Sequence, residues 1–221
     1  MQRDAWYFRE DVVKTYESWY EGKYKRADVL EKALLKRLLD TLPETRSLLE
    51  VGCGTGHFTR WFKSLGLECS GLDLSHLMLR EAKKLWADRS LLRGESAHLP
   101  FKDGSFDVVV FIACMEYMPK PVRVLTEASR IARRGIIIGL MNKWSLPTIR
   151  RILQVKMGRN PFYETARFYS VLEMKRMLRD AFGNKFQITH WNTTVFPKIF
   201  GDTESSLIPF GAFLGLAVKL R

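Results

Sequence analysis

Three glycines at alternate positions, Gly52, Gly54 and Gly56, form the part of this chain best suited to contact a ligand with its backbone. Glycine permits backbone angles that other residues avoid, and it leaves room for a ligand that a Cβ would push away. Glu50 precedes the first glycine, and its carboxylate could accept hydrogen bonds from a ligand amine. The spacing therefore predicts a site for a ligand that carries a cationic amine.

A strand and a helix must hold these glycines in place. Leu48, Leu49 and Val51 predict a short buried strand, and residues 58–65 have the apolar spacing of a helix. The start of that helix would offer free N–H groups and the positive end of its dipole. The competing dinucleotide fingerprint GxGxxG requires a small residue where this chain has His57. This difference argues against a dinucleotide-dependent oxidoreductase.

A second acidic residue follows at the end of the next predicted strand. Residues 68–74 have the composition of that strand, and Asp73 lies near its end. An acid at this place binds ribose hydroxyls in nucleotide and nucleoside sites. Asp73 is therefore placed to hold a ribose, which nucleotides and nucleosides share.

Four segments, in this order and spacing, resemble the motifs of class I S-adenosylmethionine-dependent methyltransferases. They are residues 50–56 (EVGCGTG), 71–75 (GLDLS), 94–101 (GESAHLPF) and 106–110 (FDVVV). The closest resemblance is to the small-molecule subgroup that includes quinone-biosynthesis enzymes, methyltransferase type 11, and it covers roughly residues 48–140. It implies S-adenosyl-L-methionine as cofactor, no metal, and an α/β, Rossmann-like, doubly wound fold. The seven-stranded, mostly parallel sheet of that fold ends in an antiparallel hairpin.

The resemblance also implies a role for each motif. Glu50 and the glycine loop would bind the amino-acid end of the cofactor, and Asp73 the ribose. Glu95 and Ser96 would contact the adenine, while the end of the central strand would line the path to the methyl group. The implied cofactor-binding residues are Glu50, Gly52, Cys53, Gly54, Gly56, Asp73, Leu74, Glu95, Ser96, Ile112 and Ala113.

Catalysis by such an enzyme needs little chemistry from the protein. Methyl transfer from a sulfonium is an in-line displacement, which depends on alignment and on exclusion of water rather than on a protein nucleophile. An acidic acceptor would also need a base. The candidates, in order, are Glu116, Tyr117 and His98. The subgroup often has one or two histidines where this chain has Glu116 and Tyr117. Each candidate could instead be part of a pocket wall or a surface group.

The N-terminal residues 4–42 predict two helices with a break near Gly22, because leucines recur every fourth residue in the second helix. The first helix carries a dense aromatic set, namely Trp6, Tyr7, Phe8, Tyr16, Trp19 and Tyr20. One interpretation is a brace packed on the edge of the sheet. The other is a lid in which Tyr16, Trp19 and Tyr20 touch the substrate.

The remaining elements alternate between strands and helices. Ser75 predicts the N-cap of a helix, and Ser170 with Glu173 predicts a capping box. Further strands are predicted near residues 91–92, 106–113, 136–140, 186–196 and 210–220, and a further helix ends at a cap formed by residues 133–135.

The chain has 221 residues and a formal net charge of +12, and residues 142–221 contain 13 Lys and Arg against 5 Asp and Glu. We expect a single methyltransferase domain over residues 1–221, with a helical cap at 1–45 and a variable basic segment at 142–182 on the substrate side. Trp144 in that segment is a further candidate for contact with the acceptor.

The acceptor is predicted to be a small molecule, anionic or lipid-like, since the motifs of amino-group nucleic-acid, cytosine-C5 and arginine methyltransferases are missing. RNA or a ribosomal protein as acceptor, and a cofactor-binding protein without catalysis, are the alternatives. The sequence has no apolar run of the roughly 20 residues that a membrane helix needs. Its three cysteines are scattered, which suits a cytoplasmic protein, and no oligomeric state follows from the sequence.

Overall fold

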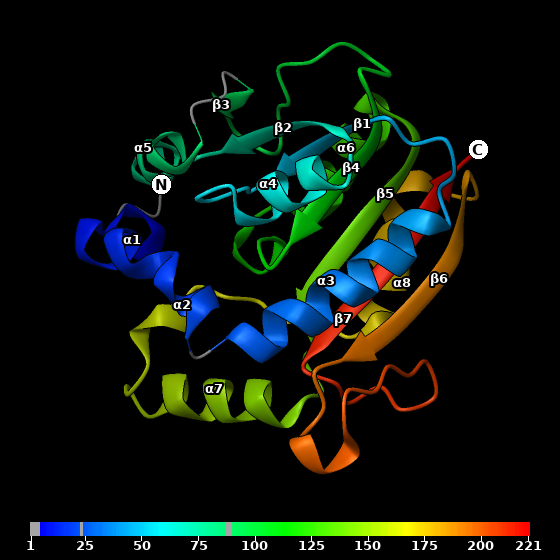
Figure 1. The fold of residues 1–221 in the computed structure, drawn as a ribbon. Helices are drawn as coiled ribbons and strands as arrows, with labels where there is room; N and C mark the ends of the chain where they lie inside the picture. The colour runs from blue at the N-terminus through cyan, green and yellow to red at the C-terminus, as the bar shows by residue number, and fades with distance from the viewer. Residues whose placement is uncertain (1–4, 23, 87–89) are drawn as a thin grey trace.

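A computed structural model of the chain describes residues 5–22, 24–86 and 90–221. Its centre is a seven-stranded sheet in the order β3-β2-β1-β4-β5-β7-β6 (Figure 1). The strands are β1 (Ser47–Val51), β2 (Glu68–Asp73), β3 (Leu91–Arg93), β4 (Phe106–Ile112), β5 (Ala132–Met141), β6 (Phe186–Thr194) and β7 (Phe213–Leu220). Strands β1 to β5 pair in parallel, whereas β7 runs antiparallel to β5 and β6. The predicted Rossmann-like sheet with an antiparallel C-terminal hairpin is confirmed.

Helices cover both faces of this sheet. On one face, α3 (Lys25–Asp40) and α4 (His57–Ser64) pack their apolar residues on β1, β4 and β7. On the other, α6 (Pro121–Ile131) and α8 (Val171–Phe182) pack on β4, β5 and β7. Residues 107–112 of β4 are therefore all buried, which explains the continuous apolar run in the sequence.

Two helix starts follow their sequence signals. The Ser75 hydroxyl accepts a hydrogen bond from the Met78 N–H at 3.3 Å and caps α5 (His76–Leu85). At the start of α8, Ser170 and Glu173 form both bonds of a capping box. Each cap satisfies N–H groups that have no partner within the helix.

The predicted cap at residues 133–135 is wrong. Strand β5 begins at Ala132, directly after α6 ends at Ile131, and Gly135 pairs with Lys219 inside the sheet. A Cβ on Gly135 would lie 2.3 Å from the Val218 carbonyl oxygen. The glycine therefore permits close packing within the sheet and does not end a helix.

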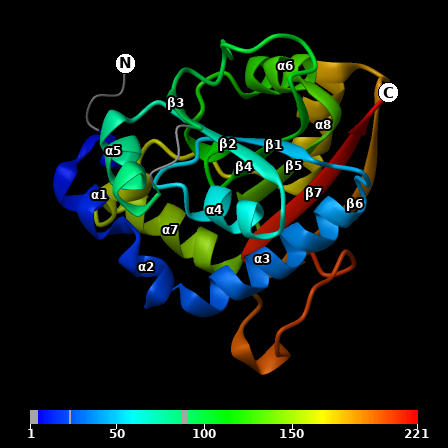
Figure 2. The same cartoon turned by 45° about the horizontal axis from the view of Figure 1, so that its top comes forward.

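The N-terminal segment is more divided than predicted. Its first part forms η1 (Trp6–Phe8), α1 (Glu10–Tyr16) and α2 (Ser18–Glu21), and the expected break at Gly22 ends α2. The basic segment contains a helix that the sequence reading missed, α7 (Leu146–Lys156), followed by η3 (Pro161–Tyr163). Two further short turns are η2 (Met115–Tyr117) and η4 (Lys198–Phe200). Figure 2 shows α1, α2 and α7 gathered beyond one end of the sheet.

Candidate active site

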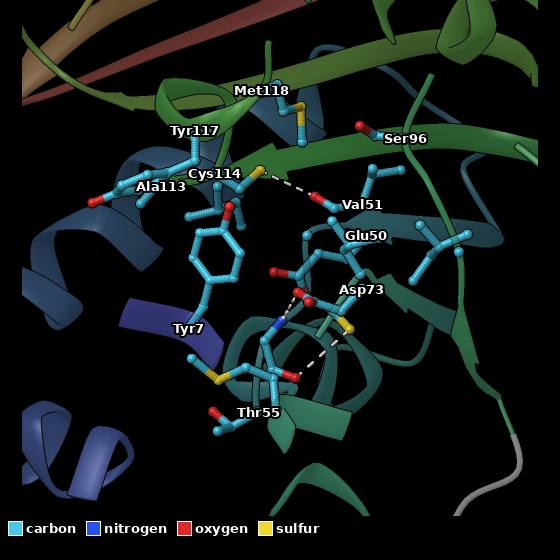
Figure 3. Close-up of a pocket in the computed structure, with 18 of the residues that line it drawn as sticks. Tyr7, Glu50, Val51, Thr55, Asp73, Ser96, Ala113, Cys114, Tyr117 and Met118 are labelled. Atoms are coloured by element: carbon cyan, nitrogen blue, oxygen red, sulfur yellow. Dashed lines mark hydrogen bonds between the residues drawn. The ribbon is translucent and has the colours of Figure 1, made fainter. Parts of the chain in front are cut away.

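The carboxyl ends of three parallel strands open into one cavity of about 400 Å³. Val51, Asp73 and Ile112, the last residues of β1, β2 and β4, all line it, and Figure 3 shows Val51 and Asp73 at the cavity. The other walls come from the glycine loop, from residues 94–97 and from the N-terminal segment. Open α/β sheets bind their ligands at this position.

The glycine loop has the backbone that its sequence predicts. Gly52 and Gly54 have φ angles of 77° and 53°, in the left-handed region that favours glycine. A Cβ on Gly52 would lie 2.6 Å from Cys114 Cβ. The loop is thus packed tightly against the end of β4 and leaves its backbone facing the cavity.

Asp73 fixes this loop and faces the cavity at the same time. One carboxylate oxygen accepts the Gly54 N–H and the other the Ser75 N–H, each at 2.8 Å. Burial raises the pKa of Asp73, although these backbone hydrogen bonds oppose the shift. Each carboxylate oxygen has a second lone pair, so ribose hydroxyls can still be bound.

Glu50 is a carboxyl group with an unusual environment. Its side chain is 2 % exposed, lines the cavity, and accepts a hydrogen bond from the Thr59 hydroxyl through one oxygen. Burial raises its pKa to about 8. A nearby cation stabilises the charged form of such a buried carboxyl. The ammonium group of an amino-acid ligand would be a suitable cation.

The structure brings most of the predicted cofactor residues to the cavity. Ten of the eleven line it, the exception being Gly56, which lies at the N-cap of α4 with a φ of 76°. Their contact with the cofactor stays a prediction, but the arrangement has room and polar groups at each expected place.

Glu116, the first candidate base, does not line the described cavity. It is 1 % exposed, and it accepts the Met141 N–H at 2.6 Å through one oxygen. Its other oxygen is buried without a hydrogen bond from any described residue. Burial raises its pKa to about 7. In the structure Glu116 joins η2 to β5, and its part in proton transfer stays a prediction.

The other candidates are divided by the fold. Tyr117 lines the cavity, as do Tyr16 and Tyr20 of the predicted substrate set. His98 is exposed beside Arg123, and Trp144 is exposed at the start of α7. Neither of these two is among the described residues of the cavity wall.

Aromatic side chains of the N-terminal segment close the cavity from one side. Trp6 stacks on Tyr16 at 5.4 Å and meets the edge of Tyr117 at 5.8 Å. Trp19 is one step removed, since it contacts Tyr16 at 5.1 Å without reaching the described cavity wall. Phe162, from η3, stacks on Trp6 at 4.4 Å. We call residues 5–22 the aromatic cap.

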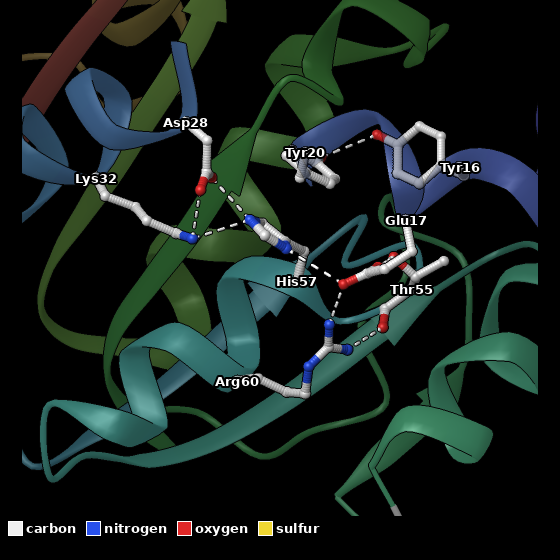
Figure 4. A network of polar contacts seen from close by, with 8 residues as sticks. All are labelled: Tyr16, Glu17, Tyr20, Asp28, Lys32, Thr55, His57 and Arg60. Atoms are coloured by element: carbon white, nitrogen blue, oxygen red, sulfur yellow. Dashed lines mark hydrogen bonds and ion pairs between the residues drawn. The ribbon is translucent and has the colours of Figure 1, made fainter. Parts of the chain in front are cut away.

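A polar network holds the aromatic cap against the glycine loop (Figure 4). Glu17, between α1 and α2, accepts the Thr55 hydroxyl at 2.6 Å and pairs with Arg60. It also lies 3.3 Å from His57 Nδ1, while Asp28 of α3 lies 2.7 Å from His57 Nε2. Two carboxylates from the N-terminal segment thus contact His57, the first residue of α4.

Burial alone would lower the pKa of His57, but the hydrogen bonds with Asp28 and Glu17 outweigh it and raise that pKa. Protonated His57 therefore stabilises the network below its usual pKa of about 6.5. This stabilisation is lost as the pH rises through the raised value.

We expect Glu17→Gln to release the aromatic cap without unfolding the protein. Only the contacts of Glu17 with Thr55, Arg60 and His57 are weakened, and the main core is untouched. Amide hydrogens of α1 should exchange roughly 10-fold faster, as for a loss of about 1.4 kcal/mol in local opening. The melting temperature should change little. Glu21→Gln, exposed on α2, is the matched control, and equal exchange in the two variants would contradict this role for Glu17.

Several residues at the site were not singled out from the sequence. Trp6 and Tyr7 line the cavity, and the dense aromatic set near the N-terminus was the signal that could have found them. Thr55 and Cys114 also line it, and the Cys114 thiol donates to the Val51 carbonyl at 3.1 Å. Glu17 carried no local sequence signal, since its partners lie about 40 residues away.

A family model described as a methyltransferase domain matches residues 49–138. A crystal structure from Thermotoga maritima, described as a SAM-dependent methyltransferase and possible histamine N-methyltransferase, superposes with a TM-score of 0.78 at 28% sequence identity. The alignment covers 96% of this chain and 98% of that one.

Two relatives extend this similarity. An uncharacterized protein of Methanocaldococcus jannaschii is 29% identical over 191 residues, 86% of this chain and 87% of that protein. The malonyl-[acyl-carrier protein] O-methyltransferase of Pectobacterium atrosepticum is 34% identical over 119 residues, 53% of this chain. The match spans about half of that enzyme, 47% of its length.

A methyltransferase domain occupies residues 49–138, and the chain is an S-adenosylmethionine-dependent methyltransferase. The matching domain, the strand order and the similarity to a methyltransferase over nearly the whole chain agree on this point. S-adenosyl-L-methionine is its cofactor.

Proposed function

We propose that this methyltransferase acts on a small, largely apolar acceptor that reaches the cavity beside the aromatic cap. The observation that carries the proposal is the wall itself, in which Trp6, Tyr7, Phe8, Tyr16 and Tyr20 face the cavity. A volume of about 400 Å³ lies in the range of small-molecule sites. An acceptor bound there would be shielded from water by aromatic rings.

The charges of the wall favour the lipid-like form of the sequence prediction over the anionic form. Among the described lining residues, Glu50, Asp73 and Glu95 are acidic, and Lys120 is the single Lys or Arg. The arginines of the basic segment lie outside this wall. An anionic acceptor would therefore find a single Lys and no Arg among the described lining residues, and an apolar or lipid-like acceptor is the better match for the aromatic wall.

The binding roles follow the positions of the groups. Glu50 would accept hydrogen bonds from the ammonium group of the cofactor, and Asp73 from the ribose hydroxyls. Glu95 and Ser96 would lie at the adenine, and Ala113 beside the reacting end. The bound cofactor supplies an electrophilic methyl group, while the protein aligns the acceptor and excludes water.

Tyr117 is the one base candidate that lines the cavity among the three. Burial raises its pKa above the usual value for a phenol, so it stays protonated at neutral pH. We propose that Tyr117 orients the acceptor through its ring and hydroxyl, and that the reaction proceeds by positioning without a strong protein base.

The test begins with mass spectrometry of small molecules that copurify with the protein, followed by titration with S-adenosylmethionine and S-adenosylhomocysteine. Neutral and lipid-like amines, phenols and hydroxyl compounds are then compared with anionic analogues, with S-adenosylhomocysteine formation as the readout. Turnover of apolar acceptors supports the proposal. Turnover confined to anionic acceptors or to RNA, or cofactor binding without any turnover, would contradict it.

Glu50 gives a prediction about pH. The pKa of Glu50 is about 8, so below pH 8 the carboxyl is mostly protonated. If Glu50 binds the cofactor ammonium as a carboxylate, binding in that pH range must release this proton. Affinity for S-adenosylhomocysteine should therefore rise as the pH increases from about 6 to 8, by at most about 10-fold per unit. Calorimetry in buffers with different ionisation enthalpies should show release of one proton.

The control for this prediction is Glu50→Gln, which has no proton to release. It should bind more weakly than the wild type and lose the pH dependence. A wild-type affinity that stays constant over this pH range would show that Glu50 does not contact the ammonium group.

A further inference from the structure

Large apolar side chains are exposed together around α7. Those above about one third exposed include Trp144, Leu146, Ile149, Leu153 and Met157 on or beside the helix, and Leu207, Ile208 and Phe210 in the β6–β7 connection. Leu207 is 92% exposed and Leu146 is 71% exposed. We call these eight residues the α7 surface. Monomeric proteins rarely leave so many large apolar groups together in water without a function.

The two parts of the α7 surface are joined. Asn142, just before α7, donates its side-chain N–H groups to the carbonyl oxygens of Pro209 and Gly211 at 2.7 and 2.8 Å. In Figure 1, α7 and the β6–β7 connection lie at the same end of the molecule, at the bottom of the view. The start of the helix therefore lies next to residues 209–211 of this connection.

The charge on α7 itself has one sign, whereas the β6–β7 connection carries Asp202 and Glu204, which pair with Arg26 and Arg37. Residues 142–163 contain five Lys and Arg and no Asp or Glu. Arg150, Lys156 and Arg159 are exposed, and the described part of the chain offers none of them an ion pair. Unpaired cations beside the apolar residues of α7 complement an anionic partner.

The order of residues along α7 is that of a helix lying at an interface. At 3.6 residues per turn, Leu146, Leu153 and Met157 fall within about 40° of one another around the helix axis. Arg150 and Lys156 lie on opposite sides of this apolar stripe. Such helices bury the stripe in the headgroup region of a bilayer, while the flanking cations attract anionic lipids.

We propose that the α7 surface docks the protein on the face of an anionic lipid bilayer. The docking would be peripheral, since no described helix is long and apolar enough to cross a membrane. RNA would satisfy the cations but would leave the leucines in water, so the bilayer explains both features. Phe162, six residues after α7 and stacked on Trp6 of the aromatic cap, places the docked face beside the proposed entrance for an apolar acceptor.

The proposal is tested by sedimentation of the full chain with phosphatidylcholine vesicles, with and without phosphatidylglycerol. We expect binding to the anionic vesicles alone, weakened by salt. Two double variants, Leu146→Ser with Leu153→Ser and Arg150→Ala with Lys156→Ala, should each lower the partition coefficient roughly 10-fold or more. These side chains are exposed, so the variants should keep the wild-type melting temperature.

The matched controls lie on α8, where Leu172, Arg176 and Arg179 are also exposed. Leu172→Ser and the pair Arg176→Ala with Arg179→Ala should leave vesicle binding within about twofold of the wild type. Equal losses in the α8 and α7 variants, or no binding to anionic vesicles, would overturn the proposal.

Two other occupants are distinguished by the same variants. Tight RNA binding that depends on Arg150 and Lys156, without vesicle binding, would assign the surface to nucleic acid. A dimer in solution that Leu153→Ser dissociates, again without vesicle binding, would assign it to a second copy of the chain. None of these measurements uses methyl transfer, so they test the docking proposal independently of the proposed acceptor.

Discussion

Gly52→Ala is expected to lower the affinity for S-adenosylhomocysteine by at least about 100-fold, or roughly 3 kcal/mol. The added Cβ would lie 2.6 Å from Cys114 Cβ and 2.9 Å from its sulfur. Because Cys114 Cβ is fixed by the backbone, the loop must move into the cavity or away from it. The left-handed φ and the overlap together should also cost about 2–5 kcal/mol of stability. Calorimetric titration and thermal unfolding measure the two effects.

Gly66→Ala is the control that separates strain from displacement. Gly66 has a φ of 90°, but nothing lies within 4 Å of its added Cβ. This variant should lose some stability and keep the wild-type affinity for the ligand. Unchanged binding by a folded Gly52→Ala variant would show that the glycine loop does not contact the cofactor.

Asp73→Ala should produce the second large loss of affinity. Loss of a charge-assisted bond to the ribose costs about 1–3 kcal/mol, which corresponds to roughly 5- to 150-fold. The structure adds to this cost, since the carboxylate also holds the N–H groups of Gly54 and Ser75. We therefore expect the upper end of this range in a titration with S-adenosylhomocysteine.

Asp73→Asn separates the two roles of this side chain. The amide keeps one acceptor oxygen, so the glycine loop should remain partly anchored, while the charge is gone. An affinity between those of the wild type and Asp73→Ala is the expected result. If both folded variants bind like the wild type, the ribose assignment is wrong.

The sequence was sufficient to predict the sheet because its signals are local. The apolar run at residues 106–113 must be a strand buried on both faces, and β4 is such a strand. The caps at Ser75 and Ser170 need only the three residues that follow them. The resemblance to a known family then supplied the seven-stranded, mostly parallel sheet with its antiparallel hairpin, which no local pattern contains.

The sequence was least informative where the outcome depends on contacts between distant residues. Gly135 has the composition of a helix cap, but its place is decided by Leu42 and Val218, which pack against it. Glu116 follows a strand end, where chemistry is expected, yet η2 turns its carboxylate toward the Met141 N–H. Trp144 is an aromatic residue in a variable segment, and only the fold shows that it lies outside the cavity.

The hydrogen bond between Thr55 and Glu17 has a consequence for the rate of turnover. Thr55 belongs to the loop that is predicted to bind the cofactor, and Glu17 joins it to the N-terminal helices, whose aromatic side chains line the same cavity. If S-adenosylhomocysteine leaves the cavity past these helices, the hydrogen bond between Glu17 and Thr55 must open first. Faster chemistry would then bring no faster cycle, because departure of the product would set the limit. The Glu17 carboxylate, although it lies away from the reacting atoms, would then set the turnover rate.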